Sequence, residues 1–158
     1  MPLEITIALG ALTLATALVG GVFMAFSDFI MRSFAFAGPT TGTDAMQAIN
    51  RQIIRSVFVP LLIALAPLSV LLALYAGVAL NTPAAGWIVA GSAIYVGGAF
   101  IVTITRNVPM NNRLDALSAP DAADYWQIYL RDWTRWNHAR SGACAVAATC
   151  YFIASNVG

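Results

Sequence analysis

The sequence predicts an all-α integral membrane protein, a four-helix bundle with extra amphipathic helices in the first and third connections. Of its 158 residues, 59% are hydrophobic and 9% are charged, whereas a soluble domain carries about 25% charged residues. The mean hydropathy is also high, at +0.76. Inside lipid the backbone must satisfy its own hydrogen bonds, so apolar runs of about 20 residues are expected to be helical spans. Four uncharged runs of 18 to 24 residues meet this length: 5–27, 57–80, 86–105 and 141–158.

The first span is predicted over residues 4–29. The opening "MPLE" has no basic residue, and the apolar run that follows is longer than the roughly 7–15 residues typical of a secretory signal. We therefore expect the segment to be retained as a helix whose far end carries Asp28.

The first connection is expected to contain a loop, "AGPTTGTDA", and then an amphipathic helix over about 43–55. Thr43 or Asp44 is expected to cap this helix. The pattern predicts a helix that lies on the bundle or is tucked under it. Its apolar residues recur at helical spacing: Met46, Ile49, Ile53 and Val57.

The second and third spans are predicted over 56–80 and 86–107, joined by the turn "NTPAAG". Pro60 and Pro67 each remove a helix hydrogen bond and are expected to kink the second span. The third span is rich in glycine, which allows close packing within the bundle or against a second copy of the chain. These glycines are Gly91, Gly97 and Gly98.

Pro109 is expected to stop or bend the third helix, because proline restricts the residue before it. The bend would gather Asn107, Asn111 and Asn112 into one polar cluster. This cluster lies on the same side of the bundle as the first connection.

The third connection is predicted to form a helix over 120–136, capped by Ser118 or Asp121. This helix can run without a break into the fourth span, 137–157. The fourth span is short, and its small residues suit close helix packing.

The charges predict the orientation of the bundle. A net charge of +1 indicates no nucleic-acid partner. Positively charged connections stay in the cytoplasm, so we expect both termini outside a bacterial inner (plasma) membrane. No repeat or linker divides the chain, so residues 1–158 are expected to form one domain. There is no lysine, and the arginines all lie in or beside the two longer connections: Arg32, Arg51, Arg55, Arg106, Arg113, Arg131, Arg135 and Arg140.

The cysteines and the histidine indicate no metal site. Cys144 and Cys150 lie six residues apart, a rise of about 9 Å on a helix, which is too far for a disulfide. We expect them to be packing residues. The only histidine, His138, cannot supply both ligands of a two-histidine haem, although it could meet Asp28 in space.

The stretch "RDWTRWNHAR", residues 131–140, places polar and aromatic side chains beside the fourth span. Thr134, His138 and Ser141 form one stripe of the predicted helix. Ionisable groups inside a membrane boundary usually face the bundle interior or water. A neighbouring face carries residues at i, i+4, i+7, i+11 and i+14: Trp126, Leu130, Trp133, Asn137 and Arg140.

We therefore expect a polar site at the cytoplasmic mouth of the bundle. Asn50 supports it, because an amide among apolar residues needs a partner, and burying it unpaired costs about 1–3 kcal/mol. His138 is the best candidate for proton transfer, since its ordinary pKa lies near neutrality. The residues that can converge there are Asp28, Asn50, Arg51, Asn107, Asn111, Asn112, Arg113, Asn137, His138 and Arg140.

Structural roles remain open for several of these residues. Trp126 and Trp133 could form an interfacial belt, and the arginines could reach the lipid headgroups. Asparagines could lock the helices together, and His138 could be a structural hydrogen-bond donor. Asp28 could form a buried ion pair with His138 or Arg140.

Four motifs, "GVFMAFSDFIM", "AMQAINR", "NVPMNNRL" and "W...WNHAR", occur in this order between the four spans. With them the chain resembles the anthrone oxygenase-like family of small membrane proteins. The resemblance implies that the protein oxidises anthrones or similar lipophilic phenols with dioxygen, with no metal or flavin cofactor. It implies three partners: the lipid bilayer, a small lipophilic aromatic substrate and dioxygen.

In this hypothesis His138 is the base that removes a proton from the substrate. Asn and Arg donors stabilise the developing charge, and aromatic rings, Phe26 among them, stack on the flat substrate. An alternative is an accessory protein that binds a lipid, a quinone or a partner helix in the same pocket. The expected substrate-binding residues are Asp28, Asn50, Asn111, Asn112, Trp133, Trp136, Asn137 and Arg140.

Overall fold

The structure, a computed structural model, describes all residues from 1 to 158 and contains only helices and their connections. It confirms the all-α class. The π-helical turns are labelled η. The elements in order are α1 (Leu3–Ala25), η1 (Phe26–Ile30), α2 (Met31–Ala37), α3 (Pro39–Ile53), α4 (Phe58–Ala79), α5 (Pro83–Ile94), η2 (Tyr95–Ile101), η3 (Thr103–Asn107), α6 (Val108–Ala116) and α7 (Ala119–Asn156).

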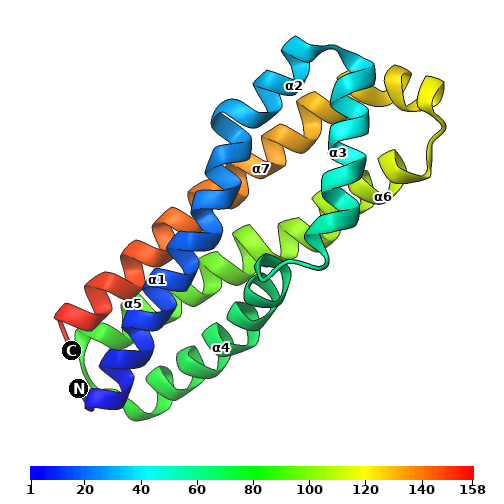
Figure 1. Ribbon diagram of the computed structural model, residues 1–158. Helices are drawn as coiled ribbons and strands as arrows, with labels where there is room; N and C mark the ends of the chain where they lie inside the picture. The colour runs from blue at the N-terminus through cyan, green and yellow to red at the C-terminus, as the bar shows by residue number, and fades with distance from the viewer.

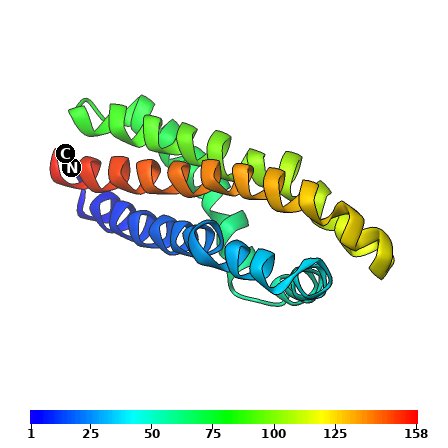
Figure 2. The ribbon, with the colours of Figure 1, turned by 90° about the horizontal axis from the view of Figure 1, so that it is seen from above.

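The chain runs up and down the long axis of the molecule (Figure 1). The first three elements form one helix, Leu3–Ala37, and α5 through α6 form another, Pro83–Ala116. From above, α7 lies between these two long helices (Figure 2). Both termini lie at one end, whereas α2, α3, α6 and the start of α7 lie at the other (Figure 1).

Three helices are long and apolar enough to cross a membrane: Leu3–Ala37, Phe58–Ala79 and Pro83–Ala116. They correspond to the first three predicted spans. The fourth predicted span is the second half of α7, which is not among the three, and it stays a prediction. At 1.5 Å per residue, a helix of 35 residues is roughly 52 Å long, against a hydrocarbon core of about 30 Å. The longer helices therefore extend beyond any bilayer that they cross.

The molecule has two separate hydrophobic cores along its long axis. The larger core joins α1, α4, α5, η2 and the second half of α7, and includes Leu9, Ile88 and Tyr151. The smaller core lies at the other end and includes Met31, Met46 and Trp126. It holds α3 against the first half of α7, so α3 is tucked into the bundle. Both cysteines are buried and free, as expected for packing residues.

Three expectations for the first connection are wrong. The expected loop is helical, because Gly38 adopts φ 96° and ends α2, and Pro39 begins α3 directly. Proline is favoured at a first helical position, where its missing N–H has no partner to lose. Thr43 and Asp44 therefore lie within α3 and cap nothing. Val57 lies in the turn between α3 and α4 and is 83% exposed, so the apolar stripe ends at Ile53.

The prolines interrupt the helices less than expected. Pro60 lies in the first turn of α4, where an N–H would have no helical partner. Pro109 lies in the first turn of α6 and does not stop the helix, because the π-helical turn η3 directly precedes it. The expectation that Pro109 stops the third helix is therefore wrong, and a bend there stays a prediction. The predicted continuity of α7 from the third connection to the C-terminus is confirmed, and Ser118 precedes its first residue.

Candidate functional site

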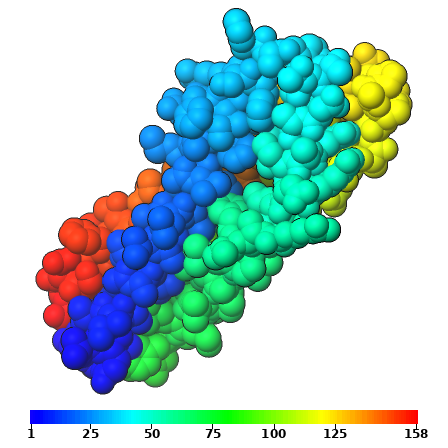
Figure 3. Space-filling view, viewed as in Figure 1, coloured from blue at the N-terminus to red at the C-terminus, as the bar shows by residue number.

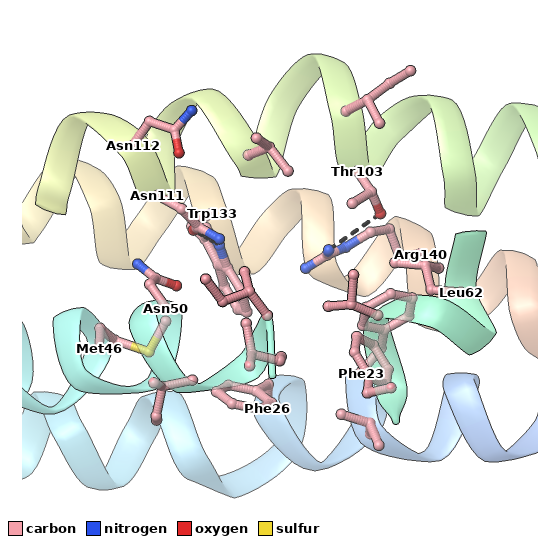
Figure 4. Close-up of a pocket in the computed structure, with 18 of the residues that line it drawn as sticks. Phe23, Phe26, Met46, Asn50, Leu62, Thr103, Asn111, Asn112, Trp133 and Arg140 are labelled. Atoms are coloured by element: carbon pink, nitrogen blue, oxygen red, sulfur yellow. Dashed lines mark hydrogen bonds between the residues drawn. The ribbon is translucent and has the colours of Figure 1, made fainter. Parts of the chain in front are cut away.

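A cavity of about 420 Å³ lies where the two hydrophobic cores meet. Its volume falls within the roughly 300–1,000 Å³ range typical of small-molecule sites. Fifteen of its 22 lining residues are hydrophobic, and they come from α1, η1, α3, α4, η2, η3, α6 and α7. Figure 4 shows the polar groups on two sides of this space, with Arg140 on one side and Asn50, Asn111 and Asn112 on the other.

Arg140 is a charged side chain with only 4% of its surface exposed. Its guanidinium carbon lies 4.1 Å from the centre of the Phe23 ring and 5.2 Å from that of Trp133. Aromatic faces attract cations in this arrangement. The two ion pairs of the molecule, Arg51–Asp115 and Arg131–Asp132, do not include Arg140, so its charge has no carboxylate partner.

Asn137 and Thr103 hold the guanidinium in place. Arg140 Nη2 donates to Asn137 Oδ1 at 2.6 Å, and Nη1 donates to Thr103 Oγ1 at 3.3 Å. Asn137 is itself fixed, because its Nδ2 donates to the carbonyl of Phe23 and to Ser27 Oγ, each at 2.6 Å. Arg140 Nε is buried without a hydrogen-bond partner. Asn137 is therefore a support for Arg140 and does not itself line the cavity.

An aromatic ladder on α7 ends at Trp133, which lines one wall of the cavity. The rings of Trp126, Tyr129 and Trp133 stack along α7 with centroids 5.8 and 6.0 Å apart. Phe26 packs against Trp133 from η1 at 5.7 Å. Successive rings at i, i+3 and i+7 share one helix face, so α7 can build the ladder without help from another element.

Asn111 is fixed at the end of this wall. Its Oδ1 accepts from Tyr129 Oη and Trp133 Nε1, both at 2.8 Å. Because an indole N–H can only donate, the atom that faces it must be the amide oxygen. The Nδ2 group of Asn111 is therefore the donor that remains for the cavity.

Asn50 and Asn112 add two more amides on the same side (Figure 4). Asn50 is half-buried, and its amide faces the Tyr129 phenol without forming a well-aligned hydrogen bond. Burial raises the pKa of the Tyr129 phenol, while Asn50 and Arg140 oppose the rise. Tyr129 therefore stays protonated and acts as the donor that orients Asn111.

Part of the rim of the cavity is apolar. Five exposed hydrophobic residues surround its openings. A hollow is visible in Figure 3 between α1–α2 and α3–α4, with α7 behind it. A lipophilic molecule can therefore enter from the side. These rim residues are Val22, Ile54, Ile63, Ile104 and Val108.

Three π-helical turns border the cavity. Each contributes a lining side chain: Phe26 from η1, Phe100 from η2 and Thr103 from η3. A π-helical turn adds a residue to the helical repeat and commonly occurs at functional sites. Here the three turns lie beside the residues that contact Arg140.

The structure does not bring His138 to the cavity. His138 is exposed, does not line the space, and takes part in none of the side-chain hydrogen bonds. We expected His138 and Asn50 to share one cavity. Asn50 lines the cavity and His138 does not, so the expectation for His138 is wrong. Successive helical residues are about 100° apart, so a helix that points Asn137 and Arg140 inward points His138 outward.

Trp136 and Asp28 also lie away from the cavity. Trp136 is 36% exposed, and the Arg106 guanidinium lies 4.8 Å from its ring centre, at the outer surface of the helices. Asp28 is exposed and lies in a shallow depression with Arg32 and Phe36. Neither contacts Arg140, so the alternative of a buried Asp28–Arg140 ion pair is also wrong.

Asp115 is the only carboxylate among the lining residues. It lies at the rim, where Arg51 Nε donates to its Oδ1 at 2.7 Å and both side chains are partly exposed. No three His, Cys, Asp or Glu side chains are grouped closely enough to hold a metal ion.

Sequence reasoning missed three residues of the site. Phe23 and Thr103 lie inside apolar runs, where nothing distinguishes them from packing residues. Tyr129 could have been found, because it precedes Trp133 by four positions and so lies on the same helix face.

The comparisons with known proteins give one finding. The sequence model of a family described as anthrone oxygenase matches residues 51–150. This region runs from the end of α3 into the last turns of α7 and includes Asn111, Trp133 and Arg140. No curated protein and no solved structure matches the chain. Because the match covers more than half of the sequence, the chain belongs to the anthrone oxygenase family.

Proposed function

We propose that the protein is a membrane-embedded, cofactor-independent oxygenase that oxidises a lipophilic phenolic or anthrone-like substrate with dioxygen. The observation that carries the proposal is a cavity with aromatic walls and one buried, unpaired arginine, in a chain of this family. A flat substrate can lie against Trp133 in the cavity, and the apolar part of the rim admits it from lipid.

The proposed reaction begins with loss of a proton from the methylene group of the anthrone. The resulting carbanion is an aromatic, phenolate-like anion, whose charge lies largely on the ketone oxygen. Arg140 is positioned to stabilise this charge, and preorganised donors of this kind supply a large part of enzymatic rate enhancement. The electron-rich anion then reduces dioxygen. One oxygen atom becomes the new carbonyl, and the other leaves as water with the two methylene hydrogens.

His138 is not the base in this proposal, because it faces away from the cavity. Asp115 is the lining group that can accept a proton, at the rim and beside Arg51. The proposal therefore assigns the main rate enhancement to stabilisation of the anion by Arg140.

The second candidate is an accessory protein that binds a lipid, a quinone or a partner helix without turnover. The absence of a histidine from the cavity favours it, as does a lining whose buried polar groups are hydrogen-bond donors. The two candidates share the site and differ in chemistry alone.

Dioxygen uptake separates them. With purified protein in lipid nanodiscs and an anthrone, we expect uptake above the spontaneous oxidation and formation of an anthraquinone. Arg140→Gln should lower kcat by about 10²–10³-fold, the usual effect of removing one donor to an oxyanion. Arg135→Gln is the matched control, because it removes an equal but exposed charge from the same helix.

His138→Ala should retain near-normal turnover. Uptake no faster than the spontaneous reaction would leave the binding protein as the function of this chain. An Arg140→Gln protein that is folded and fully active would remove the arginine from the reaction.

A further inference from the structure

We propose that the cavity binds a flat amphiphile with an anionic oxygen at one end and a neutral hydrogen-bond acceptor at the other. This names the ligand class of the same site and so rests on the proposed function. The binding itself requires no dioxygen, so it can be tested separately.

The anionic end follows from Arg140. A buried charge is costly unless it is paired, and this one has two aromatic faces, one amide oxygen and one hydroxyl oxygen as neighbours. Its Nε still has no partner. A ligand oxygen with a negative charge in the cavity supplies the missing countercharge.

Thr103 cannot replace that countercharge. Its only hydroxyl hydrogen is donated to the carbonyl of Ala99 at 2.8 Å, so its oxygen offers Arg140 a lone pair but no charge. Asn137 is equally neutral. The protein therefore holds Arg140 in position and leaves its charge uncompensated on the side of the cavity.

The neutral end follows from the amides. Asn50 and Asn112 place amides on the lining, and the amide oxygen of Asn111 is already occupied by two donors. This side therefore offers N–H groups to a ligand. No basic side chain reaches the buried part of this side, because Arg51 lies at the rim and is paired with Asp115. A carbonyl or hydroxyl oxygen suits it better than a second anion.

The Trp133 indole lies between the two ends. Its Nε1 bonds Asn111, and the centre of its ring lies 5.2 Å from the Arg140 guanidinium carbon. A planar ligand lying against this indole reaches both donor sets at once. The distance along α7 from Trp133 to Arg140 is about 10 Å, which fits two or three fused rings.

The experiment measures binding by equilibrium dialysis against nanodiscs of phosphatidylcholine, without dioxygen, with empty nanodiscs subtracted. The probes are 6-hydroxy-2-naphthoate, its methyl ester, 2-naphthoate and decanoate. We expect the naphthoate with both groups to bind about 10- to 100-fold more tightly than its ester, the range for a hydrogen bond to a charged group.

Arg140→Gln should abolish the preference for the acid while still binding the ester. The ester therefore reports that the variant is folded. Arg140→Lys, which keeps the charge, should retain part of the preference, and Arg135→Gln should retain all of it. Asn50→Leu should remove the advantage of the hydroxyl probe over 2-naphthoate.

Equal binding of acid and ester by the wild-type protein would overturn the proposal, as would an acid preference that survives in Arg140→Gln. Decanoate that binds as tightly as the naphthoates would identify the ligand as a lipid acid and overturn the flat ring. Selective acid binding without dioxygen uptake would refute the proposed reaction and leave this inference standing.

Discussion

Tyr129 and Asn111 show how a single side chain determines the chemistry of its neighbour. The phenol donates to Asn111 Oδ1, and so does the Trp133 indole. With both acceptor positions filled, the amide can present only N–H groups to the cavity. The polarity of that end of the site therefore depends on Tyr129 keeping its proton.

Burial raises the pKa of Tyr129 above its ordinary value of about 10. The unfolded chain therefore loses this proton above about pH 10, whereas the folded chain keeps it. Deprotonation then favours the unfolded state, so the free energy of unfolding falls as the pH rises further. One such group contributes a slope of up to about 1.4 kcal/mol per pH unit.

We predict that Tyr129→Phe makes thermal stability less dependent on pH between pH 9 and 11. The measurement is the unfolding temperature of the detergent-solubilised protein, followed by tryptophan fluorescence. Tyr75→Phe is the control, because Tyr75 is 41% exposed. Equal slopes for wild type and Tyr129→Phe would show that this phenol is not protected by burial.

The face of α7 could be predicted from the sequence at the level of residues. Helical spacing grouped Trp133, Asn137 and Arg140, and the structure buries all three. His138 was expected in the site because its ordinary pKa suits catalysis. Its position on the helix points it outward instead. The Asn50 prediction rested on an amide among apolar residues, and that amide lines the cavity.

At the scale of the elements, α5 through α6 are packed against α7 through small residues. A Cβ atom built on Gly98 would lie 2.6 Å from Ala143 Cβ, whereas one on Gly97 would have no atom within 4 Å. The two neighbouring glycines therefore differ in role. Gly98 allows the helices to approach, and Gly97 does not face the interface.

We predict that Gly98→Ala destabilises the protein by about 1–3 kcal/mol, the usual cost of overpacking a core. The backbone of α7 would have to move, and the cavity wall with it. Gly97→Ala is the matched control and should leave the unfolding temperature unchanged or slightly higher, since alanine favours helix over glycine. Similar losses in both variants would locate the effect in the helix itself and contradict a role for close packing.

The π-helical turns are the part of the fold that sequence periodicity could not predict. Each turn shifts the faces of the residues beyond it, so a constant period of 3.6 misplaces side chains after η2 and η3. The expected stop at Pro109 was wrong for the same reason. The π-helical turn η3 precedes the proline, and the helix continues through α6.

At the scale of the whole molecule, the charges are distributed along the long axis. No arginine lies near the termini or the α4–α5 turn, which share one end of the molecule, and all eight lie between its middle and the other end (Figure 1). This distribution supports the proposal that the arginine-bearing end is cytoplasmic and that both termini are outside a bacterial inner membrane.

We predict that a cysteine in the α4–α5 turn is accessible from outside and one before α7 is not. Asn81→Cys should react with a membrane-impermeant maleimide in intact spheroplasts, and Ser118→Cys only after the membrane is permeabilised. The wild-type chain is the control, because its two cysteines are buried. The opposite labelling pattern would reverse the proposed orientation.

The apolar rim determines which concentration governs occupancy of the site. Val22, Ile63 and Ile104 border the opening, so in the proposed membrane-embedded enzyme a ligand that enters between them arrives from the acyl chains. Occupancy then follows the mole fraction of ligand in the lipid phase. A compound that dissolves poorly in water can still fill the site. Adding empty vesicles at a constant total amount of compound dilutes it in the lipid and lowers the occupancy of the site.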